Sequence, residues 1–472
     1  MIVETSLEEE KGNDEIKGIL IKLCCGCIFW RETERKLKMT EDSETEQSYL
    51  INRQLVRFFG RLLFFAILLG LVNSTIVRIF QVTLEFIWEW LQVALLNPYP
   101  SLLVIAPGVG GLLAGTLIYN RCPEASGEGV PLYIKNVNKN QGKFPSFVGL
   151  NKFFAAVFVM GFRGSGGFVG PVVAMNAHAG AWVHRQVGKI LSGPLGLSKG
   201  NYRRGAICGV AAALGALFKI PLGGGVFAVE ILSPTKLYYN SLFPAVLAST
   251  AGTLFYNGLY DASPVFPVEL ELEMSWLLLV GIFLTSLLAG VVGLFFVRSY
   301  NKIADFFENL EISRRYLPMI GGLLAGVVGL IIGRETLGTG HTLINGLINN
   351  QVLIFAAVMF LIGRVFTTSF TIGSGGSAGF TFPAILMGFL CGYIISGLIG
   401  PLGRPDHVAL LVTGMAGLLA CVMNIPLAAI IISMELFGIS FALPAVAGSL
   451  ISFHLGRSEI IYEYREQTYD LG

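Results

Sequence analysis

Two glycine-rich stretches carry the residue types in this chain that are best suited to bind a small ion. Residues 164–173 read GSGGFVGPVV, and residues 373–383 read GSGGSAGFTFP. Glycine lets the backbone bring its N–H groups close to a ligand. Where such a stretch opens a helix, the unpaired N–H groups and the positive end of the helix dipole favour an anion. The alternative is structural, because small residues also let membrane helices pack closely.

A second pair of segments repeats later in each half of the chain. The two segments are GVAAALGALFKIPLGGGVFAVEIL (209–232) and GMAGLLACVMNIPLAAIIISMELF (414–437). Both contain Ile-Pro-Leu, and a glutamate, Glu230 or Glu435, follows each proline at the same interval. These carboxylates either cap helix ends or take part in transport. The repeated order predicts two related halves with a transport site between them.

The elements that position these stretches must lie in a membrane. Of the 472 residues, 53% are hydrophobic and 14% are charged, whereas about a quarter of a soluble chain is charged. The uncharged run 275–297 exceeds the length of about 20 residues that spans a bilayer. Other apolar runs are broken by Gly or Pro, which is tolerated only inside protein or beside a cavity. We expect an all-α polytopic membrane protein, and the net charge of +2 does not suggest a nucleic-acid partner.

The charge pattern divides the chain and predicts its orientation. Short loops at 133–143 and 298–315 are rich in Lys and Arg and should be cytoplasmic, whereas 260–273 contains neither. The expected parts are a cytosolic N-terminal segment 1–57, a first half-repeat 58–258, an extracellular linker 259–274, a second half-repeat 275–455 and a cytosolic C-terminal end 456–472 without an appended regulatory domain. Both termini are therefore expected to be cytoplasmic.

Three cysteines lie close together in the N-terminal segment, Cys24, Cys25 and Cys27. They could be reduced thiols on an amphipathic segment at the membrane surface, or sites of reversible acylation. A metal site is a third possibility, although a fourth ligand is missing.

Four segments together resemble the CLC family of chloride channels and chloride/proton antiporters. They are PEASGEGVP (123–131), GSGGFVGP (164–171), GSGGSAGFTFP (373–383) and the paired Ile-Pro-Leu segments. The resemblance covers about 58–465. It implies an inverted repeat of many tilted and broken helices, and a homodimer in contact through 209–232 and 414–437. It also implies chloride or a similar small anion as the ligand, with no metal, no other cofactor and no enzymatic activity.

Two positions depart from this family in a way that affects the expected function. The resemblance places the family's gating glutamate at Val169 and its inner proton-transfer glutamate at Ile231. Neither aliphatic side chain can carry a proton. We therefore expect an anion channel with passive, proton-uncoupled flow of chloride.

The resemblance also implies the residues of the anion site. They are Glu128, Gly167, Phe168, Val169, Gly170, Phe380, Thr381 and Tyr462, with Val169 and Glu128 as the gate positions. Tyr464 competes with Tyr462 for the last role. The Thr381 hydroxyl could face the anion or bond a carbonyl one turn back.

Glu128 replaces a serine of the family and leaves three outcomes open. It could be protonated and donate to the anion, or be ionised and occupy the anion site as an internal gate. It could also turn into the cytosolic vestibule and pair with Lys135, Lys139 or Lys219. Glu128 therefore keeps two other functions open: a proton-coupled antiporter that uses it, or a non-conducting membrane scaffold whose pore it blocks. A carrier of another anion such as fluoride or nitrate is a further alternative.

Overall fold

The computed structural model describes residues 43–190, 201–233, 236–266, 270–400, 402–457, 459 and 461–462. Cys24, Cys25, Cys27 and Tyr464 lie outside the described residues. Within those ranges the regular structure is helical, apart from one isolated β-bridge. Eight of the helices described are long and apolar enough to cross a membrane.

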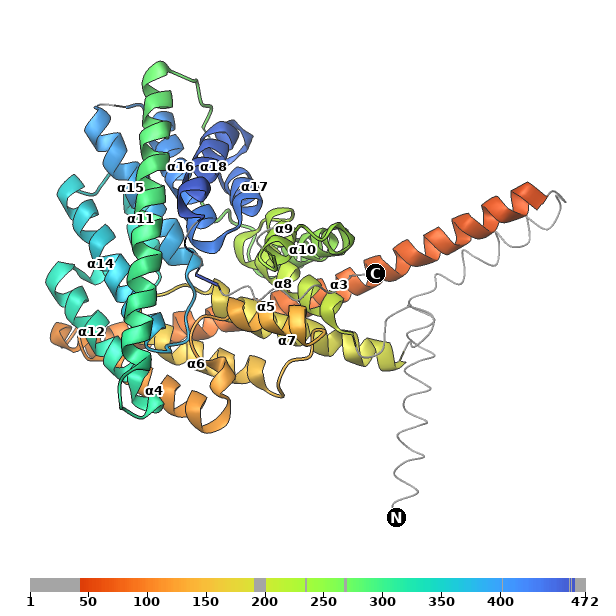
Figure 1. Ribbon diagram of the computed structural model, residues 1–472, viewed down its shortest axis with the longest axis horizontal. Helices are drawn as coiled ribbons and strands as arrows, with labels where there is room; N and C mark the ends of the chain where they lie inside the picture. Colours follow the sequence, from red (N-terminus) through yellow and green to blue (C-terminus); the bar gives the residue numbers. More distant parts are fainter. Residues whose placement is uncertain are drawn as a thin grey trace, which may run out of the picture.

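The first half of the chain forms a series of helices up to the linker predicted at 259–274. The series is α3 (Ser43–Leu91), α4 (Ala106–Arg121), α5 (Val130–Lys139), α6 (Val148–Gly161), α7 (Val169–Ile190), α8 (Arg203–Phe218), α9 (Gly223–Glu230) and α10 (Tyr239–Leu259). The candidate membrane span within α3 and the turn that follows it begins at Phe59, next to the predicted boundary at 57. Figure 1 shows the first part of α3 extending away from the body of the molecule.

The second half repeats this series in the same order. Its helices are α11 (Trp276–Glu308), α12 (Leu317–Ile332), α13 (His341–Ile348), α14 (Ile354–Gly373), α15 (Thr381–Ile399), α16 (Arg404–Met423), α17 (Pro426–Phe437) and α18 (Ala442–Gly456). Helix α10 packs against α3 and α8, and α18 packs in the same way against α11 and α16. The halves meet where α4 contacts α12 and where α9 contacts α17. The all-α inverted repeat predicted from the sequence is confirmed.

The Ile-Pro-Leu breaks have the same backbone geometry in both halves. Helix α8 ends at Lys219 with φ +60°, and α16 ends at Asn424 with φ +58°. A left-handed residue terminates a helix because it turns the next N–H away from the ladder. The proline that follows cannot donate to a helical ladder and instead starts the next short segment. Each pair of helices is thus separated by a sharp turn rather than by a flexible loop.

Glu230 and Glu435 connect the two halves through reciprocal caps. The Glu230 carboxylate accepts hydrogen bonds of 2.9 and 2.6 Å from the amides of residues 427 and 428, at the start of α17. Glu435 accepts bonds of 2.8 and 2.6 Å from the amides of residues 222 and 223, at the start of α9. A carboxylate satisfies the free amides and the dipole of a helix N-terminus. The structural alternative given above for both glutamates is therefore what the structure shows.

The segments expected to form the dimer contact are largely inside the subunit. Residues 209–218 of α8 and 414–423 of α16 are buried by other helices of the same chain. Their small residues serve internal packing: a Cβ at Gly209 would lie 2.4 Å from the Asn176 carbonyl oxygen. Burial of these stretches does not test the predicted contact, because other parts of both segments, at the starts of α9 and α17, reach the surface. A homodimer through 209–232 and 414–437 stays a prediction. In those segments the surface carries Leu222, 51% exposed, and Leu427, 41% exposed.

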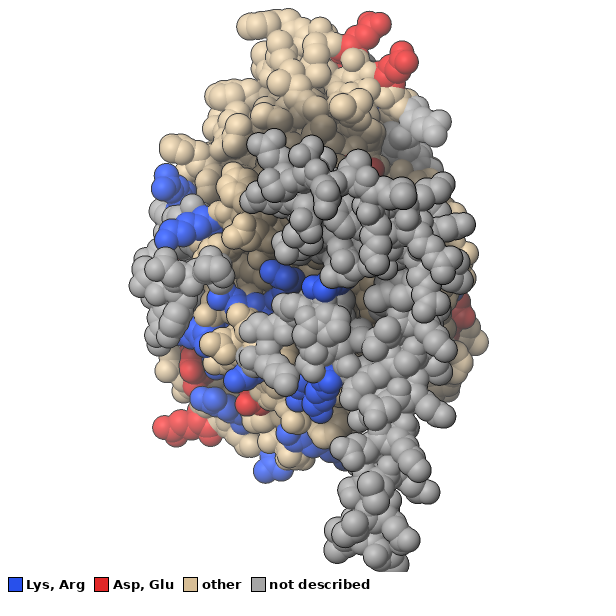
Figure 2. Space-filling view, turned by 90° about the vertical axis from the view of Figure 1, so that its right-hand side faces the viewer, with Lys and Arg blue, Asp and Glu red and all other residues tan. Residues whose placement is uncertain are grey.

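The charged side chains are unevenly distributed over the surface. Figure 2 shows Lys and Arg gathered on the lower part of one face, whereas its upper part is mostly uncharged. This uneven distribution resembles the loop asymmetry from which the orientation was expected. The cytoplasmic placement of both termini remains a prediction.

Candidate anion site

The two glycine-rich stretches meet directly, although they come from different halves. The Gly167 amide donates to the Gly379 carbonyl at 2.8 Å, and the Gly379 amide donates to the Gly167 carbonyl at 2.9 Å. This antiparallel bridge places the starts of α7 and α15 side by side. Both helices have a proline in the first turn, where its missing N–H costs no hydrogen bond.

The structural equivalence differs from the one suggested by the repeated letters GSGG. Gly164 and Gly376 each donate to a carbonyl of the preceding helix, at 2.9 and 3.1 Å. The residues before them, Arg163 and Gly375, have positive φ values of 68° and 93°. Residues 164–167 therefore correspond to 376–379, and the second GSGG, which begins at Gly373, lies earlier in the repeat.

A third helix start lies against this bridge. Helix α5 follows Gly129, where a Cβ would lie 2.0 Å from the Gly170 carbonyl oxygen. A Cβ at Gly379 would lie 2.5 Å from the Gly170 amide nitrogen. Glycine is needed at these positions because any side chain would push the backbones apart. The first turns of α5, α7 and α15 thus surround one small volume with free amide groups.

The Glu128 carboxylate occupies this volume. Its Oε2 atom accepts a 2.6 Å hydrogen bond from the Val130 amide. Its Oε1 atom would lie 2.5 Å from a Cβ at Gly170, so it rests against the start of α7. Phe380 and Tyr462 lie close to the carboxylate, with their ring centroids 6.5 Å apart, and Oε1 has no hydrogen-bond partner among the described residues. The structure thus brings Glu128, Gly170, Phe380 and Tyr462 together.

Glu128 does not turn aside toward Lys219, one of the three partners considered above. The Lys219 ammonium bonds Asp261 at 2.9 Å and also the Ser263 carbonyl, in the loop after α10. This hydrogen bond from Lys219 is the main reason why the pKa of Asp261 is held well below its usual range. Lys219 therefore stabilises a loop on the side predicted to be extracellular.

Lys152 on α6 is a functional candidate that the sequence analysis missed. It is completely buried, and its ammonium donates to the carbonyls of Gly127 at 2.5 Å and Ala125 at 3.1 Å. It also interacts electrostatically with Glu128. The signal was present, because a lone lysine in the apolar run VGLNKFFAAVFVMG is a functional-site candidate by default.

Arg364 on α14 is the counterpart of Lys152 in the second half. Its guanidinium is completely buried and donates to the carbonyls of Thr336 and Thr339, both at 3.1 Å. Each half therefore uses one buried cation to hold the carbonyls of the loop before its short helix, α5 or α13.

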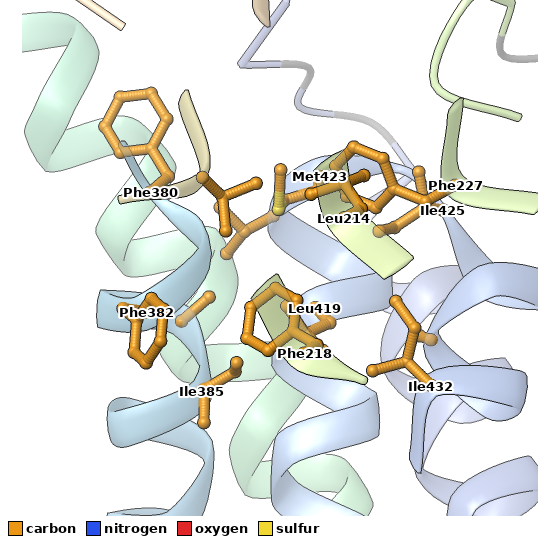
Figure 3. Close-up of a cluster of buried hydrophobic side chains, with 14 of the residues drawn as sticks. Leu214, Phe218, Phe227, Phe380, Phe382, Ile385, Leu419, Met423, Ile425 and Ile432 are labelled. Carbon is orange, nitrogen blue, oxygen red and sulfur yellow. The ribbon is translucent and has the colours of Figure 1, made fainter. Parts of the chain in front are cut away.

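The other predicted site residues belong to the starts of α7 and α15, whereas Ile231 follows the end of α9. Val169 and Ile231 are completely buried. The Thr381 hydroxyl donates to the Met423 sulfur at 3.2 Å, which is neither of the two outcomes expected. Figure 3 shows Phe382 on α15 beside Phe218, and these two rings stack with centroids 5.4 Å apart. The ring of Phe168 packs edge-on against Phe382, with centroids 5.0 Å apart.

A polar cavity begins beyond Phe168. It has a volume of about 610 Å³ and is lined by Phe168, Arg163, Arg334, Thr339 and His341, among others. Arg163 is fixed by a 2.9 Å hydrogen bond to Gln92 on the π-helical turn after α3. Glu85 and Glu335 also line the cavity, and Arg334 pairs with Glu335 at 3.5 Å, so its lining combines both signs of charge. The sequence analysis missed this cavity, because its lining residues stand far apart in the chain.

Comparisons with known proteins agree with this fold. The family described as voltage gated chloride channel matches residues 110–457. An uncharacterized protein of Methanocaldococcus jannaschii, MJ0305, is 31% identical over 345 residues, which are 72% of this chain and 82% of that protein. The H(+)/Cl(-) exchange transporter ClcA of Vibrio vulnificus is 27% identical over 399 residues, covering 79% of this chain and 81% of the relative.

Solved structures with a similar fold include two antiporters. A slow cyanobacterial Cl-/H+ antiporter has a TM-score of 0.73 at 21% identity, covering 84% of this chain and 94% of the other. A CLC-type fluoride/proton antiporter has a TM-score of 0.71 at 20% identity, covering 85% and 96%. On the family match and the relative from Methanocaldococcus, this chain is a member of the voltage gated chloride channel family, the CLC proteins.

Proposed function

We propose that this CLC protein conducts a small anion, chloride in the first instance, passively and without proton exchange. The observation that carries the proposal is the Gly167–Gly379 bridge, which brings the starts of α7 and α15 together. Free amides at helix starts bind an anion without a full positive charge. An ion bound this way can still leave, which conduction requires.

The lack of coupling follows from two buried aliphatic side chains. Val169 begins α7, and Ile231 follows the last residue of α9. Neither can accept a proton or compete for an anion site. The positions that the CLC resemblance assigns to proton transfer therefore hold no titratable group.

A proton-coupled exchanger is the second candidate, and one observation favours it. The Glu128 carboxylate is buried among the groups proposed to bind the anion, and a carboxylate there could exchange a proton with the anion. The relatives named as exchange transporters make this alternative chemically reasonable. The two candidates differ in whether protons move.

Purified protein in liposomes with a chloride gradient separates the candidates. Addition of valinomycin permits potassium to balance the charge, while chloride and pH electrodes follow the external solution. We expect rapid chloride efflux without proton uptake. Proton uptake in fixed ratio to chloride would establish the exchanger instead.

We also propose that the protein acts as a homodimer with both termini in the cytoplasm. The exposed apolar residues Leu222 and Leu427, at the starts of α9 and α17, are the parts of the predicted contact segments that can reach a partner. Cysteine substitutions at these two positions should form cross-links between subunits in membranes. Their absence, together with a monomeric mass in mild detergent, would reject the dimer.

A further inference from the structure

The Glu128 carboxylate occupies the proposed anion site, and uncoupled conduction assigns it no role. Its Oε2 atom is 2.6 Å from the Val130 amide nitrogen, and its Oε1 atom is buried against the start of α7 at Gly170 without a hydrogen-bond partner among the described residues. Free amides at helix starts favour any negatively charged atom, whether it is tethered or diffusible. The site is therefore already filled by an anion that the chain supplies.

A diffusible anion and the ionised carboxylate cannot share this volume. A Cβ at Gly170 would come within 2.5 Å of Oε1, so the carboxylate is in contact with the start of α7. Glu128 is 6% exposed, so little water screens it. Two negative charges in contact repel strongly in such a site. The diffusible anion can enter only when the carboxylate is neutral or displaced.

Lys152 supplies a positive charge whose position does not depend on the carboxylate. Its ammonium is held by the carbonyls of Gly127 and Ala125, at 2.5 and 3.1 Å. When Glu128 takes up a proton, the buried lysine loses its internal counter-charge. A diffusible anion entering the site restores the balance, since an isolated buried charge is costly.

Other titratable groups that face Glu128 do not replace it in this exchange. They are two phenols, Tyr300 on α11 and Tyr462 after α18, and the ammonium of Lys152 on α6. A free phenol ionises only at about pH 10. The starts of α7 and α15 contribute backbone amides only. On α5, the Tyr133 hydroxyl is taken by the Ala228 carbonyl at 2.6 Å. Acid can neutralise the Glu128 carboxylate, whereas it keeps the Lys152 ammonium protonated, so Glu128 is the group in this cluster whose charge acid removes.

We propose that Glu128 is a tethered anion that closes the site while ionised and opens it when protonated, so that acid activates anion flow. This gate rests on the proposed function for the identity of the flowing ion. Occupancy of the site by the carboxylate holds whether or not transport is coupled to protons.

Chloride binding to detergent-solubilised protein tests the gate without any transport. Isothermal titration at neutral pH should give Glu128→Ser about a tenfold higher affinity than the wild type, because a carboxylate that occupies the site nine-tenths of the time leaves one-tenth competent. Glu128→Gln, which keeps the shape without the charge, should also bind more tightly than the wild type. The matched control is Glu124→Ser in the same loop, whose side chain is exposed and which should bind like the wild type.

The wild type at acidic pH should approach the affinity of Glu128→Ser at neutral pH. In liposomes its chloride efflux should rise as the pH falls, whereas the efflux of Glu128→Ser should stay high and change little with pH. Equal chloride affinity of the wild type, Glu128→Ser and Glu128→Gln at neutral pH would overturn the gate, provided that all three show the same melting temperature.

A pH electrode in the same liposomes keeps the two proposals apart. Tighter binding by Glu128→Ser together with stoichiometric proton movement in the wild type would reject uncoupled conduction and leave the gate intact. Equal affinities without proton movement would reject the gate and leave uncoupled conduction intact.

Discussion

The loops before α5 and before α13 are equivalent by structure, but they carry different chemistry. Gly127 and Gly338 have positive φ values of 60° and 63°. The Gly127 amide donates to the Gly375 carbonyl at 3.0 Å, and the Gly338 amide donates to the Arg163 carbonyl at 3.2 Å. Each loop therefore crosses to the glycine stretch of the opposite half in the same way.

The difference lies in one residue of each loop and in the cation that holds it. The first loop has Glu128 and is held by Lys152, whereas the second has Thr339 and is held by Arg364. Thr339 lines the polar cavity, while the Glu128 carboxylate lies among the starts of α5, α7 and α15. Because both halves have the buried cation, we infer that it has a structural role. The acidic side chain at this position occurs in the first loop only, and we therefore assign the functional role to it.

We expect the largest difference in stability between the two halves when the buried cations, Lys152 and Arg364, are removed one at a time. Lys152→Met leaves carbonyls and the Glu128 charge without a partner, which costs about 3–5 kcal/mol of stability for a buried charge pair. Arg364→Met leaves carbonyls only, at about 1–3 kcal/mol for an unsatisfied polar group. Thermal melting in detergent measures both.

The second-site variant Glu128→Ser sharpens this comparison. Combined with Lys152→Met it should recover much of the lost stability, because the uncompensated charge is gone. Combined with Arg364→Met it should recover none. A larger loss for Arg364→Met than for Lys152→Met, or no recovery in the first double variant, would show that Glu128 and Lys152 are not coupled.

The starts of α7 and α15 offer the next comparison, because Val169 and Thr381 begin the two helices. Val169→Glu would add a second carboxylate at the amides of α7. We expect chloride efflux to fall about tenfold at neutral pH, as a second tethered anion reduces the competent fraction. Efflux should recover in acid. Val169→Gln is the matched control, and a similar loss in both variants would indicate simple steric blockage.

The reciprocal caps should respond equally in the two halves. Glu230→Gln and Glu435→Gln each weaken a helix cap, which costs about 1 kcal/mol. Both should lower the melting temperature by similar amounts and leave the ratio of protons to chloride unchanged. If Glu230→Gln alone altered proton movement in liposomes, Glu230 would take part in transport despite its capping geometry.

We expect the smallest effect on stability from a substitution at Lys219, which ends α8 as Asn424 ends α16. Lys219→Asn removes an ion pair whose Asp261 partner is exposed to solvent, worth about 0–1 kcal/mol, and introduces the residue that the second half uses at positive φ. Since the folded state lowers the pKa of Asp261, the ion pair stabilises above the unfolded pKa of about 3.9 and is lost as the pH falls further.

The melting temperatures of the wild type and Lys219→Asn should therefore differ slightly at neutral pH and converge in acid. A difference that grows toward acidic pH would contradict this role of the pair.

Composition, the repeats and the CLC resemblance together predicted the fold, whereas the residues of the anion site stay a prediction. The Ile-Pro-Leu breaks, Glu230 and Glu435 follow local rules of helix termination, which depend on residues near in the chain. The glycine stretches were expected to converge, but the identical letters GSGG do not mark equivalent positions, because the left-handed residues that precede the equivalent segments are Arg163 and Gly375.

What the sequence could not supply are contacts that depend on the packing of distant helices. The carbonyl contacts of Lys152 and Arg364 arise only when α6 and α14 pack beside loops far away in the chain. The burial of α8 and α16 likewise depends on which neighbours cover them, and composition does not specify that. The direction of the Glu128 side chain was one of three open outcomes for the same reason.

The central claim is that the starts of α5, α7 and α15 form one anion site, which Glu128 fills. Crystals of Glu128→Ser grown in bromide test it most directly, because bromide scatters anomalously. We expect one anomalous peak beside Gly170, Phe380 and Tyr462, at the place of the missing carboxylate. Efficient anion flux in Glu128→Ser with no peak at that place, or with the only bound bromide elsewhere in the subunit, would contradict the account.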